Sequence, residues 1–164
     1  LIAGSNPLIT SKTSLTKFIG RMLLFDVYDH KVMKVAEKFI ESGHLRLLGI
    51  RRDVSQLIAA TDILVFPSTV PHFARPVIEA SAMAKPVIAS DIGGPRELVV
   101  PNETGLLIPP DNPEQLAAAI VSLLDDPELM IRMGEKGYRR ATNKFDAQVN
   151  SKRTFAVYDE LLLT

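Results

Sequence analysis

The sequence contains no cysteine, no tryptophan and no excess of charge of either sign. The absence of cysteine excludes disulfide bonds, thiolate metal sites and cysteine nucleophiles. Lysine and arginine together number 19, as do aspartate and glutamate, so the formal net charge is zero. Domains that hold nucleic acid by bulk electrostatics carry a basic excess, so we expect no nucleic-acid partner. The sequence also lacks a signal-peptide pattern and any apolar run of about 18 residues, the length that spans a bilayer.

Apolar residues, by contrast, are numerous enough to form a core. They make up 46% of the 164 residues, while charged residues make up 23%. The length suits one domain. The chain opens at Leu1 without a methionine, in what looks like the end of a strand. We therefore expect one domain over residues 1–164 that is truncated at its N-terminus, with an irregular or mobile segment at residues 5–30.

Short apolar runs alternate with helical patterns along the chain. The runs, which we predict to be strands, are Leu1–Ala3, Leu45–Leu48, Ile63–Phe66, Pro86–Ala89 and Leu106–Ile108. Helical spacing or capping residues predict helices around Val32–Ile40, Asp53–Ala60, Pro76–Ala84 and Pro113–Leu124, after Asp126 and within Asp146–Leu163. This alternation is typical of βαβ units. The predicted fold class is α/β, a Rossmann-like doubly wound parallel sheet with helices on both faces.

Several residue types mark the expected boundaries of these elements. Asn112, Asp126 and Asp53 suit helix N-caps, because their side chains accept hydrogen bonds from backbone N–H groups. Pro76 suits the first position of its helix, where a missing N–H costs nothing. Gly93 and Gly94, followed by proline, predict a loop.

The loop after Ile63–Phe66 is the expected ligand site, because ligands of open α/β sheets collect beyond the carboxyl ends of the strands. It leads into the helix that begins at Pro76, and a helix N-terminus suits a phosphate. Arg75, just before that helix, adds a full charge. A plain surface arginine is the alternative interpretation.

Glu79 stands alone in an otherwise apolar segment, in the expected first turn of that helix. Its two carboxylate oxygens can hold two neighbouring hydroxyls, as on a ribose. Alternatively, Glu79 only complements the helix dipole and pairs with a lysine. The residues alone leave both interpretations open.

Other candidates have equally simple structural explanations. His72 is a possible general acid or base, but a single loop histidine without a partner is more often incidental. Gly93 and Gly94 permit close approach of a ligand or merely form a tight turn. Asp53, Asp62 and Asp91 have no metal-loop spacing, so we predict no metal site.

The stretch "ARPVIEASAMAKPVIASDIGGPRELV", with "DVSQLIAATDILVFPS" before it and "NETGLLIPPDNPEQLAAAIVSLLDDPE" after it, resembles the C-terminal, donor-binding domain of group 1 retaining glycosyltransferases. The resemblance covers about Leu45–Leu163, and more weakly residues 1–4. It implies one half of a GT-B fold, in which two Rossmann-like domains face each other. As a rule, this family requires no metal.

The family motif is Pro-Ser, two residues, Glu-Gly-Phe-Gly, and a second glutamate eight positions after the first. Pro67, Ser68 and Phe73 match, and Glu79 matches the second acid, which holds the ribose hydroxyls. The first acid, which contacts the donor sugar, is replaced by Pro71. His72 and Ala74 replace the glycines.

The departure at Pro71 matters because proline neither accepts charge nor donates an N–H. The contact with the donor sugar is therefore lost or replaced, and Arg75 or His72 is the candidate substitute, favouring an unusual or anionic sugar. The expected substrate-binding residues are Ser68, Pro71, His72, Phe73, Ala74, Arg75, Pro76, Glu79, Gly93 and Gly94. No catalytic residue is assigned.

The resemblance implies transfer of a sugar from a nucleotide diphosphate sugar to an unidentified hydroxyl acceptor, without a cofactor. An acceptor-binding domain and the Arg–Lys pair that clamps the pyrophosphate are expected before Leu1. We expect a cytoplasmic location, with contact to the inner face of a membrane only through that missing domain. Two alternatives stay open: a catalytically impaired nucleotide-binding or scaffold module, and another GT-B enzyme such as a sugar-nucleotide epimerase or a phosphorylase.

Overall fold

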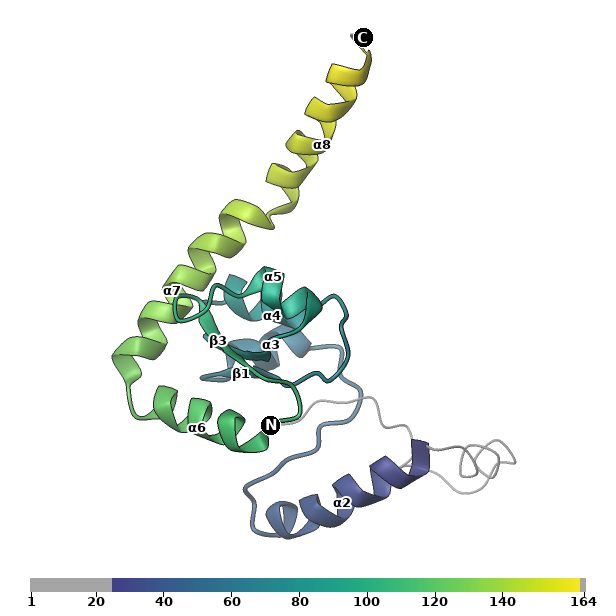
Figure 1. Cartoon of the computed structure of the whole chain (residues 1–164), viewed down its shortest axis with the longest axis vertical. Coiled ribbons are helices and arrows are strands. Elements are labelled where there is room, and N and C mark those ends of the chain that lie inside the picture. The colour runs from purple at the N-terminus through teal and green to yellow at the C-terminus, as the bar shows by residue number, and fades with distance from the viewer. Residues whose placement is uncertain (1–24, 163–164) are drawn as a thin grey trace, which may run out of the picture. The chain divides into compact units, whose positions relative to one another are not determined.

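A computed structural model describes residues 25–162 of the chain (Figure 1). The chain divides into two compact units, residues 1–53 and residues 54–164. Of the segment 5–30 that we predicted to be irregular, residues 25–30 are helical and the rest lies outside the described residues. The predicted strand Leu1–Ala3 also lies outside them. Among the described residues, every helix is too short or too polar to traverse a bilayer.

In the first unit, the structure describes one long helix and the irregular segment that follows it. Helix α2 (Phe25–Glu41) contains the predicted helical stretch. Two residues after its end lies Gly43, whose φ of 75° lets the following N–H groups of His44 and Leu45 turn back to the carbonyl of Phe39. The predicted strand Leu45–Leu48 is wrong. Only Leu47 makes a bridge, and a strand needs a paired neighbour along its whole length.

The second unit is built on a parallel sheet with the order β1–β2–β3. Its strands are β1 (Leu64–Phe66), β2 (Val87–Ser90) and β3 (Gly105–Ile108). Three of the five predicted strands are therefore confirmed. The helices are α3 (Val54–Ala59), α4 (Arg75–Ala82), α5 (Gly93–Leu98), α6 (Pro113–Leu124), α7 (Pro127–Lys144) and α8 (Ala147–Leu162).

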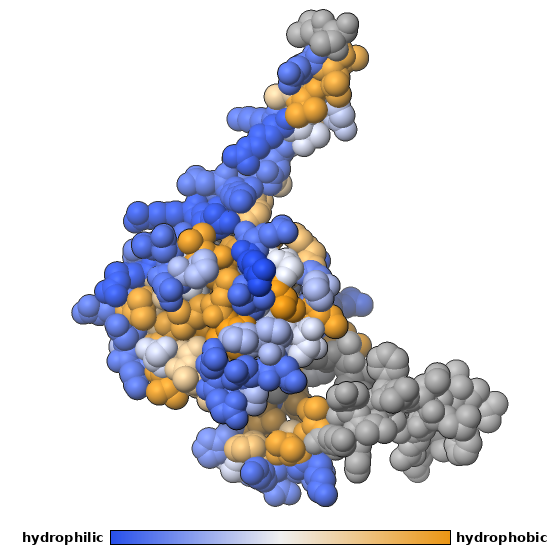
Figure 2. Space-filling view, in the orientation of Figure 1, coloured by the Kyte–Doolittle hydropathy of each residue, from blue (hydrophilic) through white to orange (hydrophobic). Residues whose placement is uncertain are grey.

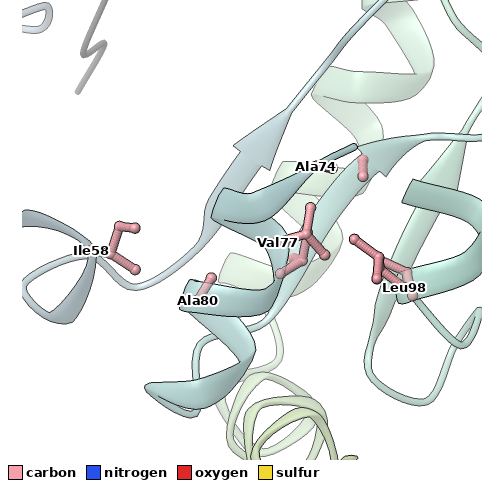
Figure 3. Packing of buried hydrophobic residues seen from close by; sticks show 8 residues of the cluster. Ile58, Ala74, Val77, Ala80 and Leu98 are labelled. Carbon is pink, nitrogen blue, oxygen red and sulfur yellow. The ribbon is translucent and has the colours of Figure 1, made fainter. Parts of the chain in front are cut away.

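Helices cover both faces of this sheet, as predicted. Val87 and Ala89 of the fully buried strand β2 point to one face, where a buried cluster also takes side chains from α3, α4 and α5. Ile88, between them, points to the other face and packs with residues of α6 and α7. Figure 3 shows the first cluster, with the side chains of Val77 and Leu98 next to each other. Each buried aliphatic side chain contributes about 1.5–3 kcal/mol relative to exposure.

The ends of α6 and α7 follow the capping chemistry expected from the sequence. The side-chain oxygen of Asn112 accepts a hydrogen bond of 2.9 Å from the N–H of Gln115. Asp126 accepts one of 2.8 Å from Leu129. Each such cap contributes about 1 kcal/mol. Asp53, the third predicted cap, instead directs its carboxylate to the guanidinium of Arg51, at 2.6 and 2.8 Å.

Two helix starts differ from the prediction. Helix α4 begins at Arg75, so Pro76 occupies its second position and Glu79 its fifth, in the second turn rather than the first. The helix ends at Ala82, before the predicted Ala84. Gly93 and Gly94, predicted to form a loop, are the first residues of α5. Their lack of a side chain serves the packing of a neighbouring loop, described below.

Helix α7 crosses the end of α4 at two of its glycines, Gly134 and Gly137, both buried. A Cβ atom on Gly134 would collide with the carbonyl oxygen of Ala84. At Gly137 the nearest atoms would lie 3.6 Å away, in Ser81, which is an ordinary contact. Gly134 therefore sets how closely the two helices approach.

Candidate functional site

Two connections lie together at the carboxyl edge of the sheet: residues 67–74, between β1 and α4, and residues 91–92, between β2 and α5. A Cβ atom on Gly93 would lie 2.8 Å from the Cβ of Pro71. One on Gly94 would collide with the carbonyl oxygen of His72. The first connection thus rests directly on the start of α5, and only glycine allows this approach.

The start of α4 presents backbone donors at this edge. None of the loop and cap hydrogen bonds formed within the described residues uses the N–H of Phe73, Ala74 or Arg75. Pro76 has no N–H, and the N–H of Val77 turns back to the carbonyl of Ala74 at 3.0 Å. Ala74 is completely buried, so the donors available to a ligand or to water are the N–H groups of Phe73 and Arg75, and the helix dipole favours an anion here.

Glu79 lies one turn further along α4, on the side of Arg75. The Nε atom of Arg75 lies 3.1 Å from Oε1 of Glu79, in an i,i+4 ion pair. The side chain of Arg75 is 79% exposed and that of Glu79 is 32% exposed. An exposed pair of this kind contributes only about 0.3–0.5 kcal/mol, so a ligand can compete for the carboxylate. The partner is an arginine of the same helix, not the lysine of the alternative interpretation.

The first half of the loop is tied into a small hydrogen-bonded turn. The hydroxyl of Ser68 donates to the carbonyl of Val70 at 2.9 Å, and Nδ1 of His72 lies 2.9 Å from the same oxygen. The ring of His72 lies against that of Phe66, the last residue of β1, with centroids 5.3 Å apart. Ser68 and His72, both predicted site residues, are therefore brought together.

Two neighbouring residues of the predicted set have opposite surroundings. Phe73 is 69% exposed, which places a large apolar ring at the rim of the site. Ala74 is completely buried, and its methyl group belongs to the core with Val77 and Leu98 (Figure 3). Ala74 therefore does not face a ligand, and the prediction of a direct contact is wrong for its side chain.

One pair at this edge was not predicted from the sequence. Arg96, on α5, donates from Nε to Oδ1 of Asp91 at 2.7 Å and from Nη2 to the carbonyl oxygen of Asp91 at 2.8 Å. Hydrogen bonding to Asp91, together with its charge, raises the pKa of the Arg96 guanidinium. This pair fixes the connection after β2 relative to α5. The spacing of five residues between the partners matches no helical pattern, so local sequence gave no signal.

The described residues bring no group of three His, Asp or Glu side chains into metal-binding proximity. Asp91 and Asp53, considered above as possible metal ligands, are each engaged by an arginine instead. The site is therefore assembled from backbone donors, the imidazole of His72 and two ion pairs, Arg75 with Glu79 and Arg96 with Asp91.

Comparison with known proteins points to one family. Residues 26–140 match the family described as glycosyl transferases group 1. The match begins within α2, earlier than the resemblance from Leu45 that the motifs indicated. Among curated relatives, a glycogen synthase of Mycobacterium tuberculosis is 34% identical over 129 residues, which cover 79% of this chain and 30% of the relative. An MMP alpha-(1->4)-mannosyltransferase of Mycolicibacterium hassiacum is 33% identical over 67% of this chain and 27% of its own length.

Solved structures agree with these relatives. HepE of Anabaena in complex with UDP-glucose superposes with a TM-score of 0.74 at 27% identity, over 84% of this chain and 38% of that one. Sucrose-phosphate synthase of Thermosynechococcus elongatus gives the same TM-score at 28% identity, over 84% and 35%. This chain thus spans well under half of the length of these four proteins. Because one family match covers most of its residues, the chain belongs to the group 1 glycosyltransferases, and its structure matches one part of their GT-B fold.

Proposed function

We propose that this chain is the donor-binding part of a glycosyltransferase that moves a sugar from a nucleoside diphosphate sugar to a hydroxyl acceptor. The carrying observation is the pairing of free backbone donors at the start of α4 with the accessible carboxylate of Glu79 one turn away. A diphosphate suits the donors, and a ribose diol suits the carboxylate. The complex of HepE with UDP-glucose supports this class of donor.

The implied chemistry is positioning and charge stabilisation. As the bond between sugar and diphosphate breaks, negative charge develops on the departing diphosphate. The backbone N–H groups of Phe73 and Arg75 and the guanidinium of Arg75 are placed to stabilise that charge. The acceptor-binding residues, and the basic pair expected to clamp the pyrophosphate, are assigned to parts of the protein outside this chain.

A nucleotide-binding or scaffold module without transfer activity is the second candidate. It is favoured by one observation, the seating of Pro71 against Gly93. Proline offers no side-chain acceptor to a sugar, and its ring occupies the approach to α5.

Nucleotide binding is tested by thermal unfolding of the chain with UDP, GDP or ADP. A nucleotide present at about 100 times its dissociation constant should add roughly 2.7 kcal/mol to the free energy of unfolding. Glu79→Ala should abolish most of this gain. Glu128→Ala is a matched control, because Glu128 forms an i,i+4 pair with Arg132 on α7. No stabilisation by any of the three nucleotides would contradict nucleotide binding, and stabilisation without transfer by the whole protein would favour the second candidate.

A further inference from the structure

The ring of His72 is held in one orientation by three neighbours. Its Nδ1 lies 2.9 Å from the carbonyl oxygen of Val70 and 3.2 Å from the hydroxyl oxygen of Ser68. The ring also contacts that of Phe66 in a tilted arrangement, with an interplanar angle of 48°. These contacts come from the end of β1 and the first half of the loop, so the ring is fixed before any ligand arrives.

The contact with Val70 favours one tautomer of the neutral ring. A carbonyl oxygen can only accept, so Nδ1 must donate to Val70. In the neutral ring, Nε2 is then left with a free lone pair. Within the described residues, no polar atom contacts Nε2. The loop therefore presents a hydrogen-bond acceptor without a partner at the carboxyl edge of the sheet.

The backbone that bears this acceptor is equally constrained. Pro71 rests on Gly93, and the carbonyl of His72 rests on Gly94. Movement of the loop toward α5 is blocked by backbone contact on one side. On the other side, Ala74 is fixed in the core. The position of the ring is therefore determined both by its own contacts and by those of its neighbours in the chain.

The loop also lacks any carboxylate. Between Pro67 and Ala74, the residues that could contact a sugar through a polar side-chain atom are Ser68, Thr69 and His72. The hydroxyl of Ser68 is already used in the turn. Pro71 has no polar side-chain atom. Thr69 is exposed, and its hydroxyl forms no hydrogen bond within the described residues, so of the two remaining side chains only the ring of His72 is held in place by contacts.

We propose that His72 determines donor specificity, with its Nε2 accepting a hydrogen bond from a hydroxyl of the transferred sugar. The proposal rests on the function proposed above and assigns the sugar contact to His72 rather than to Pro71 or Arg75. A neutral imidazole accepts from a hydroxyl as a carboxylate does, but it does not repel a negatively charged group nearby. The site would therefore accept hexuronic acid donors as well as neutral hexoses.

Substitution of His72 by asparagine or by glutamine distinguishes the roles of its two ring nitrogens. In His72→Asn the side-chain amide reaches the position of Nδ1 and keeps the bond to Val70, but nothing stands at Nε2. In His72→Gln the amide reaches the position of Nε2 and the bond to Val70 is lost. Calorimetric titration of each variant with UDP, GDP and ADP, and with their glucose conjugates, gives the contribution of the sugar as a ratio of two dissociation constants.

We expect His72→Asn to weaken binding of the glucose conjugate about five- to tenfold, the value of one hydrogen bond, while binding of the nucleoside diphosphate changes less than about twofold. His72→Gln should retain most of the affinity for the conjugate. Melting temperatures of both variants check that each is folded. The ratio between the dissociation constants of His72→Asn and of the wild-type chain should be the same for a UDP-hexuronic acid as for UDP-glucose.

Three results would overturn the assignment. Equal weakening of nucleotide and conjugate would place His72 at the diphosphate or in a purely structural role. No change in either affinity would remove it from the site, and equal loss in the Asn and Gln variants would exclude Nε2 as the contacting atom. Failure of the unaltered chain to bind any nucleotide is a separate result, which removes the proposed function itself.

Discussion

Pro71 packs against Gly93 so closely that a Cβ atom on Gly93 would lie 2.8 Å from the Cβ of the proline. The φ of Gly93 is 30°, in the left-handed region that other residues rarely adopt. The connection after β1 and the start of α5 therefore form one packed unit. The residue that departs from the family motif is a structural part of that unit.

Alanine at Gly93 and alanine at Gly94 should respond differently to a second substitution at Pro71. Gly93→Ala meets the side chain of Pro71, so the added change Pro71→Gly should recover part of the lost stability. Gly94→Ala meets the backbone carbonyl of His72, which no substitution can remove. We expect each alanine to lower the free energy of unfolding by about 1–3 kcal/mol, measured by urea titration. Equal rescue of both variants by Pro71→Gly would contradict this packing.

A carboxylate restored at Pro71 should change the donor preference. Pro71→Glu places a negative charge beside the proposed sugar contact, so affinity should fall for a UDP-hexuronic acid relative to UDP-glucose. About a fivefold change in the ratio of the two dissociation constants is expected, equivalent to about 1 kcal/mol. Pro71→Gln is the uncharged control. An unchanged ratio in Pro71→Glu would place residue 71 away from the sugar.

Helix α7 should tolerate alanine at one glycine and not at the other. Gly134→Ala would drive a methyl group into the carbonyl of Ala84 and should cost at least about 2 kcal/mol. Gly137→Ala meets only ordinary contacts and should be neutral or stabilising by up to about 1 kcal/mol, because alanine favours helix. Thermal unfolding of the two variants, which differ by three positions on one helix, checks the prediction. A similar Tm for both would contradict the close crossing.

Arg140 should stabilise α5 from a distance of more than 40 residues in sequence. Its Nε and Nη2 atoms donate to the carbonyls of Leu98 and Glu97, at 3.2 and 3.0 Å, and a cation at a helix C-terminus complements the dipole. Arg140→Ala should lower the free energy of unfolding by about 1–2 kcal/mol, and Arg140→Lys by less. The neighbouring Arg139, which is exposed, provides the control, since Arg139→Ala should change little.

The pair of Arg51 and Asp53 should be visible in an acid titration. Hydrogen bonding to Arg51 lowers the pKa of the Asp53 carboxyl below its ordinary value of 3.8. Because the pKa of Asp53 is lower in the folded state than in the unfolded chain, its ionised carboxylate stabilises the folded state above pH 3.8. This contribution is lost as the pH falls through the pKa that Asp53 has in the folded state. Arg51→Gln should return the pKa of Asp53 toward 3.8 in an NMR titration. The same change at Arg52, which makes no ion pair with Asp53, should leave the pKa where it is.

The sequence predicted those elements whose cause is local. Asn112 and Asp126 each cap a helix through a bond to a residue three positions away, and the apolar run at Pro86–Ala89 is the buried strand β2, shifted by one residue. Ser68, Arg75 and Glu79 were likewise placed correctly at the carboxyl edge, because a parallel sheet brings loops of this kind together. The roles of these residues toward a ligand stay predictions.

The errors arose where a distant contact decides the structure. Gly93 and Gly94 have the composition of a turn, yet they begin a helix, and the close approach of Pro71 and His72 explains why both positions lack a side chain. Ala74 stands where the family has glycine, and the core accommodates its methyl group. Neither contact has a signature within a few residues of sequence. Asp53 followed a capping pattern, but the nearby guanidinium of Arg51 is the stronger partner.

The distribution of contacts along the last two helices indicates where the polypeptide can be shortened. Arg140 binds α5, and Phe145, just after α7, packs against the core. Helix α8 has no buried residue and exposes Phe155, Tyr158 and Leu161, and Figure 2 shows apolar surface towards its far end. A stop codon after Phe145 should therefore leave the folded body intact, whereas one before Arg140 would remove the two hydrogen bonds to the end of α5 and should destabilise the fold. Ending the polypeptide at Phe145 would also remove the exposed apolar side chains of α8. Because exposed apolar patches favour self-association, the shorter polypeptide should be the better material for ligand titrations and crystallisation.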